Sequence, residues 1–275
     1  MGKENFNRYS LKNNFMKQVL FRLDYKGVLD IKEIVEVFQE KHKSKFETFE
    51  TAYHNHVDVE LTNINDISDT LSIPVKEIVK QDIYRFTNNT FSDDEVILDI
   101  SKYFTTLTIK CKNYKTIDLY RDFFAEFIDL LYKVEDYISI KRFGLRKLGG
   151  VVLESLDQIP QIFEKEFFNI DFEGNNFTSV KNNYVDILEK SEPKTPTINY
   201  RRSFEKGKLL NEDGSETVAY QVLLDFDGFL DEQKLIDSEL VKTKNISTII
   251  DMTNDCLFEI FKMSVTEEFL SKSSK

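Results

Sequence analysis

Short linkers between alternating segments are the feature that most constrains the fold of this 275-residue chain. Residues 82–86, 96–100 and 103–110 alternate apolar and polar side chains, which is typical of half-buried strands. The residues between them carry turn chemistry. Because a parallel crossover needs a dozen or more residues, these segments are predicted to pair antiparallel.

The rest of the chain places helices between runs of strands. Further strands are predicted at residues 19–25, 56–61, 137–152, 197–208 and 217–229, helices at 31–38, 115–133 and 245–263, and an amphipathic segment at 162–168. This order predicts an α+β fold with antiparallel sheets and helices packed on one face. We expect two related halves packed as one compact unit: 1–165 with the order β-α-β-β-β-α-β, and 166–275 with a β-hairpin plus a helix.

Composition excludes several classes of protein. Hydrophobic residues make up 41% and charged residues 31%, as in a globular domain. No membrane span or signal peptide is evident, so a cytoplasmic protein is expected. Cys111 and Cys256 are far apart and are expected to be free thiols. The net charge of −11 disfavours nucleic acid, because phosphate binding depends on Lys and Arg. A protein partner or an oligomer is expected instead.

Charged residues cluster on three predicted strands. In "IKRFGLRKLGG", residues 140–150, Arg142 and Arg146 are predicted to share one face of a strand. Lys141 and Lys147 then lie on the other face. The candidate ligand-binding residues are Arg142, Arg146, Arg201, Arg202, Asp225 and Asp227. If the arginines face inward they need carboxylate partners, and an internal Arg–Asp network is the favoured interpretation.

Catalytic patterns are incomplete. With three histidines and no G-x-S-x-G elbow, a triad hydrolase is disfavoured. Asp225 and Asp227 have a spacing that can hold Mg²⁺, but no Gly-rich phosphate loop accompanies them. His54 and His56 have the spacing of two metal ligands, yet an exposed strand face explains them as well. We predict no catalytic residues, no metal and no cofactor.

The segment Arg142-Phe143-Gly144-Leu145-Arg146 matches an R-[IVF]-G-L-R signature, and "VLLDFDGF" (222–229) and "LFEIFKMSVTEEF" (257–269) follow in the matching order. In these features the chain resembles a sporadically distributed, functionally uncharacterised bacterial family often met near mobile or defence-related genes. That family usually continues with Tyr-Ile-Asn, where this chain has Lys147-Leu148-Gly149-Gly150. The resemblance implies an architecture and a genomic setting but no mechanism.

Three functional hypotheses remain open. The leading one is a non-enzymatic binding or regulatory component of an anti-phage defence or mobile-element system. It would recognise a protein or a nucleotide-type ligand in a cleft between the halves. The alternative is a metal-dependent nuclease or RNA-binding and processing protein, which resembles the ferredoxin-like CRISPR proteins at the level of fold. In it Asp225 and Asp227 would hold the metal. The third is an oligomeric scaffold.

Overall fold

One antiparallel sheet organises the molecule. The computed structural model describes residues 3–11, 15–26, 28, 30–59, 75–91, 94–134, 138–168, 180–190, 195–210, 214–237 and 245–274, without the side chains of 5, 54–59, 75–80 and 89–91. These residues form nine strands in the order β2-β3-β4-β5-β1-β6-β9-β8-β7, and all neighbours pair antiparallel. The predicted sheets are therefore one continuous sheet, which is open at β2 and β7.

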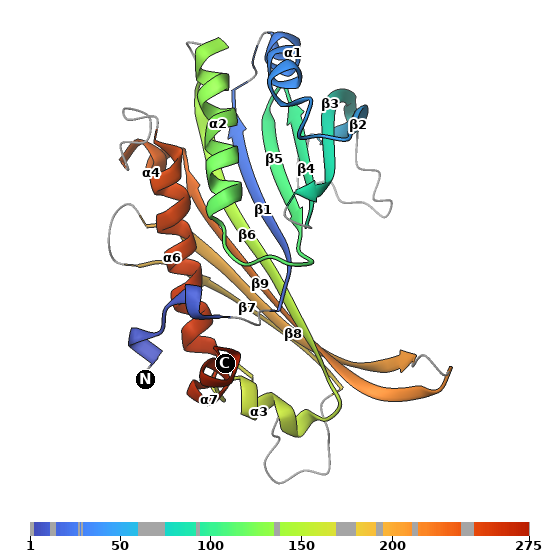
Figure 1. Ribbon diagram of the computed structural model, residues 1–275, viewed down its shortest axis with the longest axis vertical. Helices are drawn as coiled ribbons and strands as arrows, with labels where there is room; N and C mark the ends of the chain where they lie inside the picture. The colour runs from blue at the N-terminus through green and yellow to red at the C-terminus, as the bar shows by residue number, and fades with distance from the viewer. Residues whose placement is uncertain are drawn as a thin grey trace, which may run out of the picture.

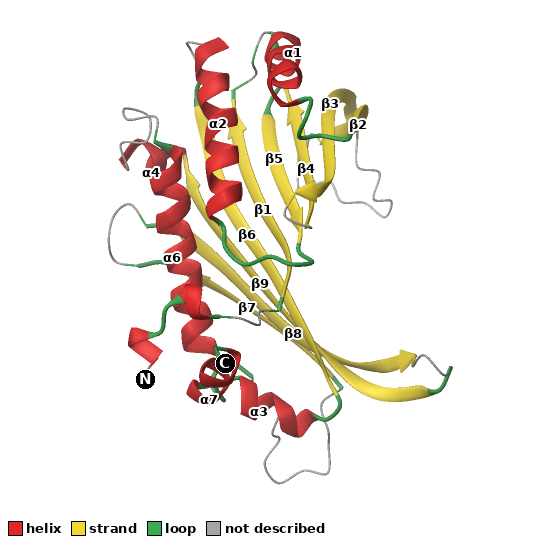
Figure 2. Cartoon of the chain, in the orientation of Figure 1, coloured by secondary structure: helices red, strands yellow, loops and turns green. Residues whose placement is uncertain are grey.

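The strands carry the labels of Figure 1. They are β1 (Met16–Tyr25), β2 (Thr48–Val59), β3 (Val75–Phe91), β4 (Asp94–Ser101), β5 (Phe104–Lys110), β6 (Ile140–Leu153), β7 (Lys181–Leu188), β8 (Thr197–Leu210) and β9 (Glu216–Asp231). Beyond β6, the far ends of β8 and β9 continue as a projecting two-stranded arm (Figure 2). The hairpin predicted between them is confirmed, and Gly214 in its turn has a φ of 82°.

Helices cover one face of the sheet, where α1, α2 and α6 lie across the strands (Figure 1). The described helices are α1 (Ile31–His42), α2 (Asp118–Val134), α3 (Ile159–Ile162), α4 (Glu232–Asp237), α6 (Ile246–Ser264) and α7 (Glu267–Ser273), with 3₁₀ turns η1 (Lys3–Asn5), η2 (Arg8–Ser10) and η3 (Leu156–Gln158). The predicted α+β class with helices on one face is confirmed. Within the described part of the chain, no helix combines the length and hydropathy needed to cross a membrane.

Alternation along the strands separates the two faces of the sheet. On β1, Phe21 and Leu23 are fully buried beneath the helices, whereas Arg22 and Asp24 point to the opposite side and are partly exposed. The ring of Phe21 packs 5.3 Å from that of Phe124 on α2. An antiparallel sheet can bury one face and solvate the other, and this one does. We call the two sides the helix face and the open face.

The strand order contains a repeat. β1 leads into α1, the meander β2–β5 returns to pair with β1, and α2 follows. β6 leads into α3, the meander β7–β9 returns to pair with β6, and α4 and α6 follow. The repeat begins anew at β6, whereas the expected halves, 1–165 and 166–275, assign β6 to the first. That division stays a prediction.

Local structure differs from prediction in three places. The amphipathic segment at 162–168 does not form one regular element, since helix α3 ends at Ile162 and Phe163 forms a β-bridge with Val265. Strand β2 begins at Thr48 rather than at residue 56, and residues 60–61 lie outside the described part. Strand β7 was not predicted, because its segment is polar and its apolar residues Val185 and Ile187 face solvent at the sheet edge.

Candidate functional site

Five of the six predicted site residues lie on the open face, on three adjacent strands between β1 and the edge strand β7. They are Arg142, Arg146, Arg201, Asp225 and Asp227, from β6, β8 and β9. The register places Arg146 opposite Asp227 and Arg201 opposite Asp225. Because residues two apart share a face of a strand, the short spacings in the sequence are enough to gather these groups on one side.

Arginine–aspartate pairs neutralise much of this charge. Arg146 donates Nε–H to Asp225 at 2.8 Å and Nη2–H at 2.7 Å. Hydrogen bonding to Asp225 raises the pKa of Arg146 above its usual value. Arg142 lies 3.7 Å from Asp227, and its guanidinium sits 4.6 Å from the centre of the Phe229 ring. The predicted Arg–Asp network therefore exists, but both arginines are about 40% exposed rather than internal.

Gly144 of the signature segment separates the two arginines on the open face. A glycine inside a strand often marks the close approach of a helix or of a neighbouring backbone. A Cβ at this position would meet its nearest neighbour, the Gly228 carbonyl oxygen, at 3.9 Å, which is ordinary contact. The glycine therefore does not mark a close approach.

Arg202 is separated from the other candidates, because it points to the helix face. Its side chain is 8% exposed and lies over the rings of Tyr184, Tyr200 and Phe167 at 4.9–5.4 Å. It donates to the carboxylate of Asp186 and to the backbone carbonyl of Phe167. These contacts tie the segment after α3 to the sheet, so Arg202 holds the fold rather than the open-face cluster.

The open face has a hollow where the strands of the two repeats, β1–β5 and β6–β9, meet. The hollow has a volume of about 750 Å³ and is bounded by residues of β1, β5, β6, β7, β8 and β9. Leu148, Leu223 and Val185 supply apolar surface, and Lys110 and Arg201 supply positive charge. Lys110 is paired with Glu95, whereas Arg201 is exposed and makes no hydrogen bond or ion pair with a described residue.

The same geometry weighs against a metal centre at the aspartates. Asp225 already accepts hydrogen bonds from Arg146, and Asp227 lies beside Arg142. A metal needs carboxylate oxygens that are free to coordinate it. In the described ranges no three His, Cys, Asp or Glu side chains are grouped as metal ligands would be. The side chains of His54 and His56, on β2, lie outside the described residues.

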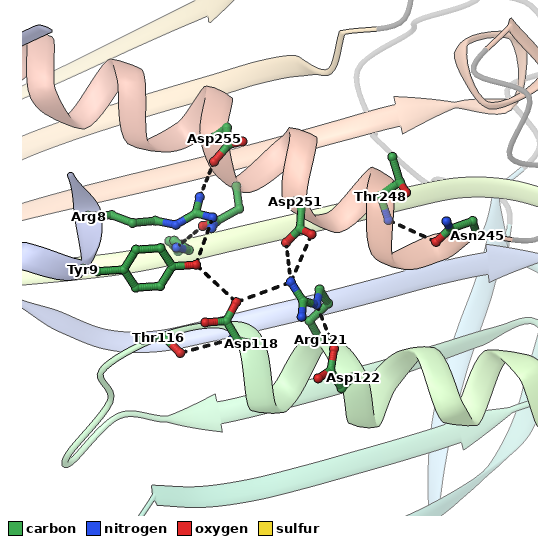
Figure 3. A network of polar contacts seen from close by, with 12 residues as sticks. Arg8, Tyr9, Thr116, Asp118, Arg121, Asp122, Asn245, Thr248, Asp251 and Asp255 are labelled. Carbon is green, nitrogen blue, oxygen red and sulfur yellow. Dashed lines mark hydrogen bonds and ion pairs between the residues drawn. The ribbon is translucent and has the colours of Figure 1, made fainter. Parts of the chain in front are cut away.

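A second polar cluster lies on the helix face, where η2, α2 and α6 meet (Figure 3). Arg121 of α2 donates to both carboxylate oxygens of Asp251 on α6, at 2.9 and 3.0 Å. Arg8 of η2 pairs with Asp255 one turn later on α6, and the neighbouring Tyr9 hydroxyl lies 3.5 Å from Asp118 of α2. These contacts hold the N-terminal segment over the junction of the two helices.

Lys147 lies beneath this cluster and was not among the predicted site residues. Its predicted direction is confirmed, since it faces the helices and bonds to Asn254 of α6. Its neighbours on that face of β6, Phe143 and Leu145, are fully buried. A lysine at an apolar register position was the one signal in the sequence that could have drawn attention to it.

Comparisons with protein-family models, with curated proteins and with solved structures find no match for this chain. No family is therefore assigned by comparison, and the resemblance carried by residues 142–146 stays an expectation.

Proposed function

We propose that this protein is a non-enzymatic binding or regulatory protein that takes a nucleotide-type ligand into the hollow of the open face. The observation that carries the proposal is the exposed guanidinium of Arg201 beside an apolar floor. Arg202 also borders the hollow but is bound to Asp186 and Phe167. The nearby Arg146 is paired with Asp225, so Arg201 is the arginine that remains open to an anion.

The shape and chemistry of the hollow support this class of ligand. Its volume of about 750 Å³ falls within the ~300–1,000 Å³ of typical small-molecule sites. A phosphate fits Arg201, with the ion-paired Lys110 nearby, and a base or sugar fits the apolar surface of Leu148 and Leu223. Since the hollow is built on strands, its groups are held by a rigid scaffold. The net charge of −11 favours a small ligand over a long nucleic acid.

The proposed biological role rests on the resemblance. Membership of an anti-phage defence or mobile-element system follows from the genomic setting of the family that residues 142–146 resemble. We also propose a protein partner, which the acidic composition and the open face of the sheet support. In this scheme nucleotide binding regulates the interaction with the partner.

Calorimetric titration with AMP, ATP and GTP tests the site, with adenosine and guanosine as uncharged controls. The Arg201→Glu variant is expected to bind nucleotides at least tenfold more weakly, because it replaces a charge-assisted contact by repulsion. Lys206→Glu makes the same charge change on an exposed side chain of β8 outside the hollow and is expected to bind normally. Equal affinities for the two variants, or no nucleotide binding by the wild type, overturn the proposal.

A further inference from the structure

A cavity of about 80 Å³ lies on the helix face, beneath the N-terminal segment and between α6 and residues 114–117, which precede α2. It is separate from the hollow, which is on the opposite face of the sheet. Its walls are mostly apolar and include Leu11, Phe15, Ile117, Leu257, Phe258 and Phe261. Polar residues also line it, namely Lys147 and Asn254 together with Arg8, Tyr9, Lys115 and Thr116. An apolar cavity with a few convergent polar groups is the usual form of a small-molecule site.

Lys147 brings a cation into these surroundings. Its ammonium lies 5.9 Å from the centre of the Tyr114 ring and donates to Oδ1 of Asn254. An ammonium has three N–H donors, and among the described residues this is the hydrogen bond that Lys147 makes. Burial, together with the nearby Arg8, lowers the pKa of Lys147 to about 8. An anion beside this group would offset the cost of its burial.

Asn254 adds a second unused donor. It is 1% exposed, and its Nδ2 group has no hydrogen-bond partner among the described residues. The amide cannot be turned around without cost, because Lys147 can only donate and therefore requires the oxygen. A buried N–H group without an acceptor costs about 1–3 kcal/mol. The cavity is thus rich in donors and poor in acceptors.

We propose that this cavity binds a small monocarboxylate with a short apolar body. The carboxylate oxygens accept from Lys147 and from the Nδ2 group of Asn254, and the hydrocarbon contacts the aromatic wall. A cavity of about 150 Å³ holds the six non-hydrogen atoms of benzene, so one of 80 Å³ encloses roughly three. Propionate and butyrate would therefore fill the cavity with one end and extend into its mouth with the other.

The charges around the cavity favour an anion. Arg8 stands at its rim, and the aspartates that face it from the helices are occupied: Asp255 by Arg8, and Asp118 by Arg121 and Tyr9. Burial raises the pKa of the neighbouring Cys111 thiol to about 12, which keeps that group neutral at physiological pH. Lys147 and the lining Lys115 therefore supply the positive charge that the cavity presents to a ligand.

Nitrogen-15 NMR with sodium butyrate as the probe tests the proposal. The side-chain NH₂ signals of Asn254, identified by their loss in Asn254→Asp, are expected to move downfield and to saturate as butyrate is added. Butyramide and butanol have the same body without the charge and are expected to bind at least tenfold more weakly. The full chain is used throughout.

Two variants and one control complete the test. Lys147→Met keeps the length of the side chain and is expected to weaken butyrate binding at least tenfold. Asn254→Asp places an internal carboxylate beside Lys147. It is expected to abolish binding, because this carboxylate pairs with Lys147 and repels the carboxylate of the ligand. Lys141→Met, on the same strand and face but paired with Glu232 on α4, is expected to bind as the wild type does. No saturable shift in the wild type, or unchanged affinity in Lys147→Met, overturns the proposal.

Discussion

Arg146 and Asp225 are joined by two hydrogen bonds across the open face, at 2.8 and 2.7 Å. Arg85 and Asp99 repeat the arrangement between β3 and β4, at 2.7 and 2.9 Å. In both pairs the arginine is 36–41% exposed and the aspartate only 15–16%. Removing the arginine therefore leaves a mostly buried carboxylate without a partner, whereas removing the aspartate leaves a guanidinium that is partly in water.

Arg146→Ala is expected to lower the free energy of unfolding more than Asp225→Ala, by about 1 kcal/mol. The first variant leaves a mostly buried carboxylate without its partner, whereas the second leaves a guanidinium that water can reach. Urea unfolding of the single and double variants measures both effects and their coupling. Arg85→Ala and Asp99→Ala form a matched comparison with the same expected order. Equal losses within either pair would contradict this account.

Because of Lys147, the stability of the protein is expected to rise between pH 8 and pH 9, and above pH 9 the raised pKa of the Cys111 thiol opposes this contribution. Burial lowers the pKa of Lys147 from 10.5 to about 8, so in this window the unfolded chain binds a proton that the folded chain does not. The shift corresponds to roughly 3 kcal/mol. Lys147→Met should lack the rise and should be more stable than the wild type at pH 7. Thermal unfolding across the pH range, without added carboxylate, measures this. Parallel profiles for the two proteins would rule it out.

Gly228→Ala is expected to destabilise the fold by about 1–3 kcal/mol through overpacking. A Cβ at this position of β9 would lie 2.9 Å from Thr253 and 3.0 Å from Leu257, where α6 packs on the sheet. Gly207→Ala is the matched control on β8, since a Cβ there meets no heavy atom within 4 Å. The control should be neutral or slightly stabilising. Denaturant midpoints of the two variants distinguish them, and a neutral Gly228→Ala would refute the packing argument.

Self-association is expected through the edge strand β7. Val185 and Ile187 on this strand are 61% and 70% exposed, and an apolar edge strand invites pairing with a second copy. Ile187→Lys should reduce any growth of the particle mass with concentration. Val218→Lys, at an exposed position of the arm, should leave it unchanged. Light scattering over a concentration series reports both, and a mass that stays at 32.4 kDa for the wild type would exclude this interface.

The strands and their faces were predictable because they depend on local patterns. A period of two in residues 140–148 is enough to place Arg142 and Arg146 on one face and Lys147 on the other. Short linkers likewise predict antiparallel pairing from 82 to 110. Segments such as β7 were not predicted from the sequence. This strand lies at the edge of the sheet with its side chains exposed or half-exposed, so its sequence shows little hydrophobic periodicity.

Tertiary structure alone decided which charged groups meet. Arg146 lies opposite Asp227 in the register yet bonds to Asp225, 79 residues away in the chain. Arg202 has the same local character as Arg201 but is buried among aromatic rings. Lys147 meets Asn254 because α6 crosses β6 at that point. Such contacts depend on strand order and helix placement, which the whole core determines, so a local pattern contains no record of them.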